Sequence, residues 1–351
     1  MKETLNKALT AGWIRLSRSV HPNRLLQRYL IDDFTYHPMS GLPEVRDECV
    51  QAGFAPSRAH RHRHFVCELP GAWAEPVTGR VIWHGRLVVR SYDHSTYQPV
   101  SSRTLADFVL ARAGRREVDA YPTVLLLRDP AGANYWHFFD DVLPKLEWID
   151  RIKLGSDVVV LVGADIWEKS FFQQAIRRGE LSDYRWTPHT RVVRADRLIF
   201  GRHGSMRRVN AELVRRLLAA PVPSGDRRLF LTRSPQRSRH LENEPELRQA
   251  LASVGFEAVD TDSLSLDEQI SMFAETSSVV AVHGAGLANL IFRIGGPLRL
   301  LELFPADYIS PQFAWLAGEF GFQYDAIAGT ALTRSGTFRV EIEALMGRVA
   351  G

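Results

Sequence analysis

The chain has 351 residues, 45% of them hydrophobic, which is enough for a full core and, at roughly 150 residues per domain, for two domains. The net charge is +4, and the basic residues are almost all arginine, with only five lysines. Guanidinium groups favour phosphate or carboxylate partners, and no basic stripe interleaved with aromatic residues indicates nucleic acid, so no nucleic-acid partner is expected. No run reaches the roughly 18 apolar residues of a membrane-spanning helix, so an integral membrane protein is not expected.

Residues 1–30 have the pattern of an amphipathic helix, with Leu5, Leu9 and Trp13 in an apolar stripe opposite basic residues. Two alternatives stay open: peripheral attachment to a membrane, or a packed surface helix, which is favoured. The segment lacks the apolar core of a signal peptide, and Cys49 and Cys67 lack zinc-ligand spacing. We therefore expect a reduced, cytoplasmic protein, with peripheral contact at the inner face of the membrane through residues 1–30 as the alternative.

The region before residue 110 contains one clear hairpin pattern, in which residues 79–83 and 86–90 flank the tight turn His84-Gly85. Upstream, His60, His62 and His64 would share one face of an extended segment, as metal ligands do. No carboxylate or cysteine stands at ligand spacing beside them, so an edge or a turn is favoured over a metal site.

From residue 123 onward, short buried strands alternate with helices, which is typical of parallel sheets with crossover helices. Strands are predicted at residues 123–127, 158–162, 197–200, 228–232, 257–259, 278–282 and 298–302. Helices are predicted near residues 136–149, 167–178, 210–219, 245–254, 266–275, 287–292 and 311–320. A Pro- and Gly-containing stretch at 219–226 is typical of a linker. We therefore predict three parts: an N-terminal helix and β element at 1–110, an α/β domain at 111–220 and a second α/β domain at 221–351.

The strongest local signal is the buried strand 278–282, which runs into His283-Gly284-Ala285-Gly286 and an apolar helix. A strand that turns through glycines into a helix start presents free backbone N–H groups, which suit a diphosphate. The alternative is a tight turn made for packing alone, with His283 a structural histidine.

Three charged residues in the same half add to this signal. Glu302 stands in a run of leucines, where a buried carboxylate needs partners such as ribose hydroxyls, unless it reaches water at the strand end. Arg233 and Arg239 follow a strand and could neutralise a departing diphosphate, although arginine runs are more often solvated faces.

A third motif lies in the first half, where Asn134 precedes an aromatic helix that carries His137, Asp140 and Asp141. On a helix, His137 and Asp141 share a face, so the carboxylate could orient or polarise the imidazole as in a general base. The alternative is a structural helix that Asn134 caps at its N-terminus.

Taken in chain order, three blocks resemble the family 61 glycosyltransferases over roughly residues 121–324. The blocks are Asn134, His137 and Asp141-Val142-Leu143-Pro144; Thr232-Arg233-Ser234 with Arg239 and Asn243-Glu244; and His283-Gly284-Ala285-Gly286-Leu287 with Asn289 and Phe292. Departures from the family pattern are Asp140, a second acid beside Asp141, and Pro235 after the arginine.

The resemblance implies a GT-B fold, with two Rossmann-like domains facing a cleft, and an inverting transfer from a nucleotide sugar, commonly a UDP-sugar. Relatives include capsular polysaccharide enzymes and xylosyl-, arabinosyl- and N-acetylglucosaminyltransferases, so a glycan or lipid-linked glycan acceptor in bacterial surface polysaccharide synthesis is expected. The residues that match the donor side are Arg233, Arg239, His283, Gly284, Ala285, Gly286, Asn289 and Glu302. Asp141 and His137 match the catalytic side and Asn134 the acceptor side, and Asp141 is slightly favoured over His137 as the base.

The alternatives to this hypothesis are weaker on the residues. Asp260-Thr261-Asp262 spells a metal-binding Asp-x-Asp, but turn and helix-cap chemistry explains it as well, so a metal-independent enzyme without a cofactor is expected. A serine hydrolase would need a Gly-x-Ser-x-Gly motif, which is missing from the sequence. A non-catalytic transferase-like protein that binds a glycan or a nucleotide stays open.

Overall fold

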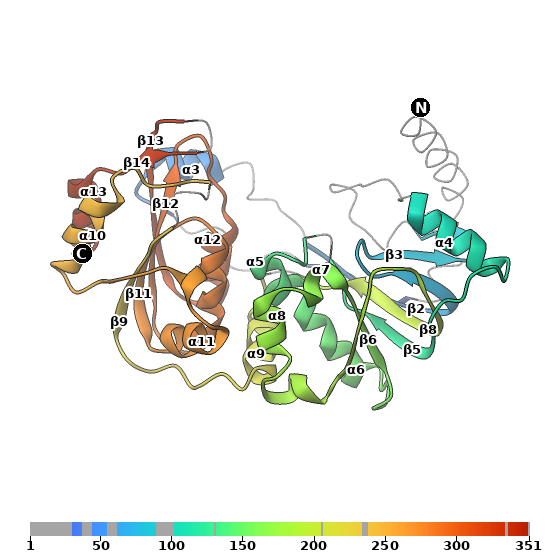
Figure 1. The fold of residues 1–351 in the computed structure, drawn as a ribbon. Helices are drawn as coiled ribbons and strands as arrows, with labels where there is room; N and C mark the ends of the chain where they lie inside the picture. Colours follow the sequence, from blue (N-terminus) through green and yellow to red (C-terminus); the bar gives the residue numbers. More distant parts are fainter. Residues whose placement is uncertain are drawn as a thin grey trace. The chain divides into compact units, whose positions relative to one another are not determined.

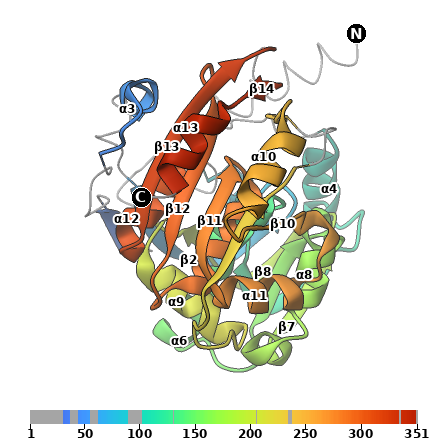
Figure 2. The same cartoon turned by 90° about the vertical axis from the view of Figure 1, so that its left-hand side faces the viewer.

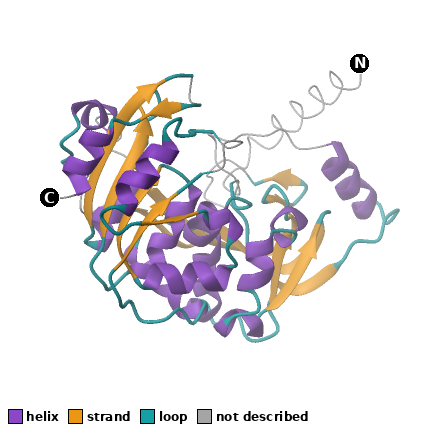
Figure 3. Ribbon diagram, turned by 60° about the vertical axis from the view of Figure 1, so that its left-hand side comes forward, coloured by secondary structure: helices purple, strands orange, loops and turns teal. Residues whose placement is uncertain are grey.

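The computed structural model describes residues 30–36, 44–54, 62–88, 102–129, 131–204, 206–233, 238–333 and 336–349. It is a mixed α/β structure with two sheets (Figure 3), and the chain divides into two compact units. The first unit comprises Met1–Tyr36 and Arg63–Gly204, and the second His37–His62 and Ser205–Gly351. The helix predicted within residues 1–30 falls outside the described residues, except for Leu30. Across the described ranges, no helix combines the length and the apolar character that a membrane crossing requires.

The sheet of the first unit joins a parallel half to an antiparallel half, in the order β4-β3-β2-β8-β5-β6-β7, with β1 paired to β2. Its strands are β1 (Leu30–Tyr36), β2 (His62–Glu75), β3 (Arg80–Trp83), β4 (Arg86–Leu87), β5 (Ala120–Leu126), β6 (Val159–Gly163), β7 (Arg185–His189) and β8 (Val193–Arg202). The predicted hairpin is confirmed as β3–β4, and both turn residues, His84 and Gly85, adopt positive φ angles as two-residue hairpin turns require. Buried aliphatic side chains of β5, β6 and β8 form its core.

The helices of the first unit are short. They are α4 (Ser102–Arg112), α5 (Tyr135–His137), η5 (Phe138–Val142), η6 (Leu143–Leu146), α6 (Glu147–Arg151), α7 (Ala164–Trp167), α8 (Ser170–Ala175) and η7 (Gly179–Asp183). The single helix predicted at 136–149 is therefore four pieces: an α-helical turn, a π-helical turn, a 3₁₀ turn and another α-helical turn. Pro144 explains the break, because it has no N–H to continue the helical ladder.

The second unit is built on the sheet β10-β9-β11-β12-β13-β14, which is parallel except for β14. Its strands are β9 (Arg227–Leu231), β10 (Glu257–Val259), β11 (Thr276–Val282), β12 (Arg299–Pro305), β13 (Gln323–Ala331) and β14 (Phe338–Arg339). Its helices are α3 (Glu48–Phe54), α9 (Arg208–Leu217), α10 (Glu244–Ala252), η8 (Thr261–Ser263), α11 (Leu266–Ala274), η9 (Ala285–Arg293), α12 (Gln312–Phe320) and α13 (Ile342–Val349). Helices α10 and α13 cover one face of the sheet, and α11 and α12 lie on the other (Figures 1 and 2).

Local signals explain several helix ends in this unit. Ser265 and Glu268 form a reciprocal capping box at the start of α11, and Gly321 ends α12 in the left-handed conformation at φ 76°. The helix predicted from residue 287 begins at Ala285 and is a 3₁₀ helix.

The compact units divide the chain differently from the predicted domains. Helix α9 belongs to the second unit, and so does α3, which packs on β13 although it precedes the β2–β4 strands in sequence (Figure 1). Phe54 at the end of α3 is 1% exposed and packs edge-on against Phe304 of β12. The residues predicted as one N-terminal element are therefore shared between the two units.

The segment predicted as a linker, 219–226, is anchored to the second unit. The buried guanidinium of Arg293 donates to the carbonyl oxygens of Ser224 and Gly225, and also to Ala274 O at 2.7 Å. Arg215 donates to Pro221 O at 2.9 Å. Two arginines thus fix the backbone that leads into β9.

Candidate functional site

In the second unit, the order of the strands marks where a ligand is expected. The chain moves outward from β9 to β10 and then returns to β11 on the other side of β9, so the order reverses between β9 and β11. Open parallel sheets bind ligands beyond the carboxyl ends of their strands at such a switch point. Arg233 follows β9 and His283 follows β11, so two predicted donor-side residues lie at this point.

Arg233 lies across the loop that follows β11. Its Nη1 donates to the carbonyl oxygen of His283 at 2.7 Å. A Cβ atom on Gly284 would overlap the same Nη1. Because the φ of Gly284 is 170°, which any residue can adopt, a side chain here is opposed by the present position of the guanidinium and not by backbone conformation. The first glycine of the motif therefore makes room for the arginine.

The start of η9 offers backbone donors. Ala285 and Gly286 are partly exposed, whereas the loop residues on either side of them, Gly284 and Leu287, are buried. The first N–H groups of a helix have no partner within it, so this turn can accept an anion. A Cβ on Gly286 would lie 3.0 Å from Thr261 Oγ1, so η8 packs closely beside this loop.

The side chain of Asn289 is buried and holds the loop in shape. The residue is fully buried, and its Nδ2 donates to Gln269 Oε1 at 2.8 Å and to Gly286 O at 3.1 Å. The amide thus ties η9 to α11, and a contact of Asn289 with the donor stays a prediction.

His283 and Glu302 form a buried pair, with 2.7 Å between Nδ1 and Oε1. The other carboxylate oxygen accepts from the hydroxyl of Tyr324, also at 2.7 Å. Glu302 is 0% exposed. Both of its oxygens have protein partners, and the ribose contact expected for Glu302 stays a prediction. Tyr324 was not predicted, because only the register of β12 and β13 brings it to Glu302.

Arg239 joins the same cluster through an aromatic ring. Its guanidinium lies 5.0 Å from the ring centroid of Tyr308, and the ring of Tyr308 lies 5.9 Å from that of His283. The Nε of Arg239 is buried and has no hydrogen-bond partner in the part of the chain that the structure describes. Such an orphaned donor is uncommon and would be satisfied by a bound anion.

A second polar cluster lies at the corresponding point of the first unit. Its parallel strands have the order β7-β6-β5-β8, which reverses between β5 and β8. Asp129 follows β5 and Arg202 ends β8. The aromatic turn beside them carries His137 and Asp141, and His137 Nδ1 lies 2.7 Å from Asp141 Oδ2. The predicted pair thus forms, although on π-helical backbone.

Burial and charge set the protonation of this second cluster. Burial raises the pKa of Asp129, and the nearby Asp141 raises it further. Burial alone would lower the pKa of His137, but the hydrogen bond and charge of Asp141 outweigh it, so that pKa is raised. Burial lowers the pKa of Lys145 to about 8, although both carboxylates act in the opposite direction. Asp129 and Lys145 were missed; the signal for Asp129 is a charged residue directly after a buried parallel strand.

The same residues have the spacing of a cation site. One ligand atom each from Asp129, His137 and Asp141 lies within 4.8 Å of the others. Lys145 and Arg202 already place positive charge beside these carboxylates, which opposes a metal ion there. At the Asp-x-Asp sequence, Asp260 Oδ1 accepts from the backbone N–H of Asp262 at 3.0 Å, which is turn chemistry.

Asn134 is exposed and caps α5. Its Oδ1 accepts from the backbone N–H of Trp136 at 2.9 Å. The structural alternative considered for this residue is therefore present, and a role toward an acceptor stays a prediction.

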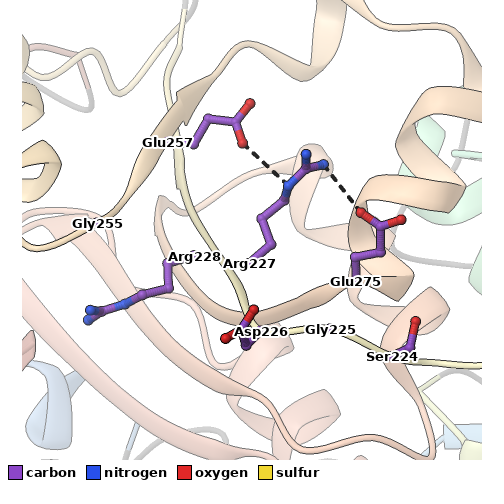
Figure 4. Close-up of a pocket in the computed structure, with 8 residues that line it drawn as sticks. All are labelled: Ser224, Gly225, Asp226, Arg227, Arg228, Gly255, Glu257 and Glu275. Atoms are coloured by element: carbon purple, nitrogen blue, oxygen red, sulfur yellow. Dashed lines mark ion pairs between the residues drawn. The ribbon is translucent and has the colours of Figure 1, made fainter.

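A surface pocket lies at the opposite edge of the second sheet (Figure 4). Arg227 stands between two glutamates there, with 3.4 Å to Glu257 and 3.7 Å to Glu275. The pocket is lined by Ser224, Gly225, Asp226, Arg227, Arg228, Gly255, Glu257 and Glu275. These residues lie at the amino ends of β9, β10 and β11, away from the glycine loop.

Residues 135–296 match the model of the family Glycosyltransferase 61. The matched segment contains His137, Asp141, Arg233 and the whole loop from His283 to Asn289. No curated protein matches the chain.

Proposed function

Because this chain carries a family 61 glycosyltransferase domain and is a glycosyltransferase, we propose that it transfers a sugar, with inversion, from a UDP-sugar to a glycan or lipid-linked glycan. We place this reaction in bacterial surface polysaccharide synthesis, such as capsule, by a cytoplasmic enzyme of the GT-B type. Contact of residues 1–30 with the inner face of the membrane stays a prediction.

The observation that carries the proposal is the position of Arg233 beside the glycine loop at the switch point of the second unit. Arg233 lies at a loop whose residues Ala285 and Gly286 are partly exposed at a helix start, and this combination suits the charge of a nucleotide diphosphate. Arg239 adds a second cation, and His283 can donate from Nε2, the ring nitrogen that Glu302 leaves available, when the imidazole is protonated on both nitrogens.

In the proposed reaction, the acceptor oxygen attacks the anomeric carbon while the bond to the diphosphate oxygen breaks and UDP leaves. Asp141 takes the proton of the acceptor hydroxyl, and His137 orients the carboxylate through their 2.7 Å hydrogen bond. A single displacement of this kind inverts the anomeric centre. Arg233, Arg239 and His283 stabilise the charge on the leaving diphosphate.

We further propose that the reaction needs no metal ion. Three cationic or hydrogen-bonding side chains serve the diphosphate, and the acidic cluster in the first unit is already balanced by Lys145 and Arg202. If a divalent ion is required, Asp129, His137 and Asp141 are the residues that would hold it.

The test is calorimetric titration of the full chain with UDP, GDP and CMP, with and without EDTA. We expect UDP to bind in EDTA, and Arg233→Ala to weaken it by about tenfold or more, since a hydrogen bond between charged groups is lost. Arg227→Ala is the matched control, because this arginine pairs with Glu257 and Glu275 at the opposite edge of the sheet. If no nucleotide binds the wild-type chain, the donor site is wrong.

A transfer assay then tests the catalytic pair. Asp141→Asn should abolish transfer and donor hydrolysis while UDP affinity is retained. A wild-type chain that binds UDP but neither transfers nor hydrolyses any UDP-sugar would favour the non-catalytic alternative.

A further inference from the structure

A buried chain of hydrogen bonds links three neighbouring strands of the second unit. It runs from the hydroxyl of Tyr324 on β13 to Glu302 on β12 and on to His283 at the end of β11, with 2.7 Å at each step. Glu302 is 0% and His283 3% exposed. A carboxylate in such a place is retained only if its partners compensate for the water it has lost.

The positions of the hydrogens in these two hydrogen bonds can be assigned. Burial raises the pKa of Tyr324 well above its ordinary value, and the neighbouring charge of Glu302 raises it further, so the phenol keeps its hydrogen and donates it. An ionised carboxylate only accepts hydrogen bonds. With Glu302 ionised, the hydrogen of the second bond therefore sits on Nδ1 of His283. Nε2 is left for a ligand, and it donates to an anion only when it carries a hydrogen as well.

Packing fixes the plane of the imidazole but not its two nitrogens. The ring stacks on Phe304 at 5.2 Å between centroids and contacts Phe313 and Tyr308. These contacts are aromatic and do not distinguish one nitrogen from the other. The hydrogen bond to Glu302 is what decides which nitrogen points away from the sheet.

The charged and titratable groups around the ring agree with this arrangement. Glu302 and Tyr324 lie on the neighbouring strands, Arg233 contacts the backbone carbonyl of His283, and Arg239 lies beyond Tyr308. Glu302 is thus the carboxylate that faces the imidazole, and its second oxygen would be unsatisfied without the hydroxyl of Tyr324.

We propose that Glu302 and Tyr324 are positioning residues: they hold His283 through its Nδ1–H, so that Nε2, protonated when the donor binds, donates to the diphosphate. The proposal rests on the nucleotide-binding role given above to the second unit. It assigns to Tyr324 a function in donor binding that acts through His283 and without contact to the donor.

A double-mutant cycle on UDP affinity is the first test. Tyr324→Phe keeps the ring and removes only the hydroxyl, and we expect UDP binding to weaken by about tenfold as Glu302 loses a charged hydrogen bond. In a His283→Ala background, Tyr324→Phe should not weaken UDP binding further, because the histidine through which Tyr324 acts is already missing. Equal losses in both backgrounds would show a general structural role and overturn the proposal.

The matched control is Tyr121→Phe in the first unit. The hydroxyl of Tyr121 also bonds a histidine, at 2.9 Å from His189 Nε2, but lies outside the proposed donor site. This variant should bind UDP as the wild type does.

Nitrogen-15 NMR of histidine-labelled full-length protein without nucleotide is the second test. The signal of His283, assigned by its loss in His283→Ala, should show a hydrogen on Nδ1, and Tyr324→Phe should change it. A wild-type Nδ1 without a hydrogen would overturn the proposal even if Tyr324→Phe folds poorly. Since this readout needs no nucleotide, a wild type that does not bind UDP would refute the donor site and leave the positioning measurable.

Discussion

At the scale of single residues, Lys145 is a source of pH-dependent stability. Its pKa is about 8 in the folded protein against an ordinary 10.5, so between these values the unfolded chain holds more protons and stability rises with pH. The rise amounts to roughly 3 kcal/mol over that interval. We expect Lys145→Met to remove it, as measured by urea unfolding from pH 7 to 10.5. Tyr324 titrates in the wild type and in Lys145→Met alike, so its effect cancels when the two unfolding free energies are subtracted. Equal slopes of unfolding free energy against pH in the two proteins would contradict the prediction.

Gly284 gives a second residue-scale prediction. A methyl group there would displace the guanidinium of Arg233, so Gly284→Ala should weaken UDP binding by about tenfold, as loss of a charged hydrogen bond does. Gly347→Ala is the control: its Cβ would meet nothing within 4 Å in α13, and it should stabilise the chain by up to about 1 kcal/mol. Calorimetry and thermal unfolding measure both effects. Unchanged UDP affinity in Gly284→Ala would disprove the spatial role of this glycine.

Residue types and their place after a strand could be predicted, whereas pairing across the sheet could not. Arg233 and His283 were expected at strand ends, and parallel packing brings them together. Glu302 was correctly expected to need partners, but the partner is Tyr324, which depends on the register between β12 and β13. The burial of Asn289 could not be predicted either, because a motif does not tell which of its side chains face inward.

At the scale of elements, α3 is predicted to stabilise the second unit. Phe54 is buried against Phe304 and lies 6.3 Å from Tyr324 between ring centroids. Phe54→Ala should therefore lower the free energy of unfolding by about 3–5 kcal/mol, the usual range for a buried phenylalanine. Leu332→Ala, at a residue that is 51% exposed, should change it little. Chemical denaturation compares the two, and similar small changes in both would argue against tight packing of α3.

The elements themselves were largely predictable where periodicity and caps were strong. Strands β5 to β12, with the exception of β7, and helices α9 to α12 follow buried runs or apolar stripes in the sequence. One helix was predicted at residues 136–149, because the apolar spacing there does not reveal the wide turn at Phe138–Val142. Beyond residue 120, strands β7, β13 and β14 were missed: β7 is polar and partly exposed, and β13 and β14 depend on pairing with β12 and with each other.

At the scale of the whole molecule, the division into units predicts how the chain behaves when cut. The chain passes from one unit to the other after residues 36, 62 and 204. A protease site inserted after Gly204 should yield fragments that still elute together, because α3 of the first fragment packs in the second unit. Size-exclusion chromatography before and after cleavage measures this, and adding Phe54→Ala should promote separation. Fragments that separate at once in the wild-type background would contradict the packing of α3.

The path of α3 also limits how enzymes of this kind can be recombined. A chimera that exchanges only residues 205–351 would combine β12 and β13 of one protein with Phe54 and Asp47 of another. Asp47 is part of the packing that such a chimera would disturb, because its Oδ2 accepts from the backbone N–H of Ala328 at 2.9 Å. For the donor site proposed in the second unit, a transplant that keeps these contacts therefore needs two inserts, 37–62 together with 205–351.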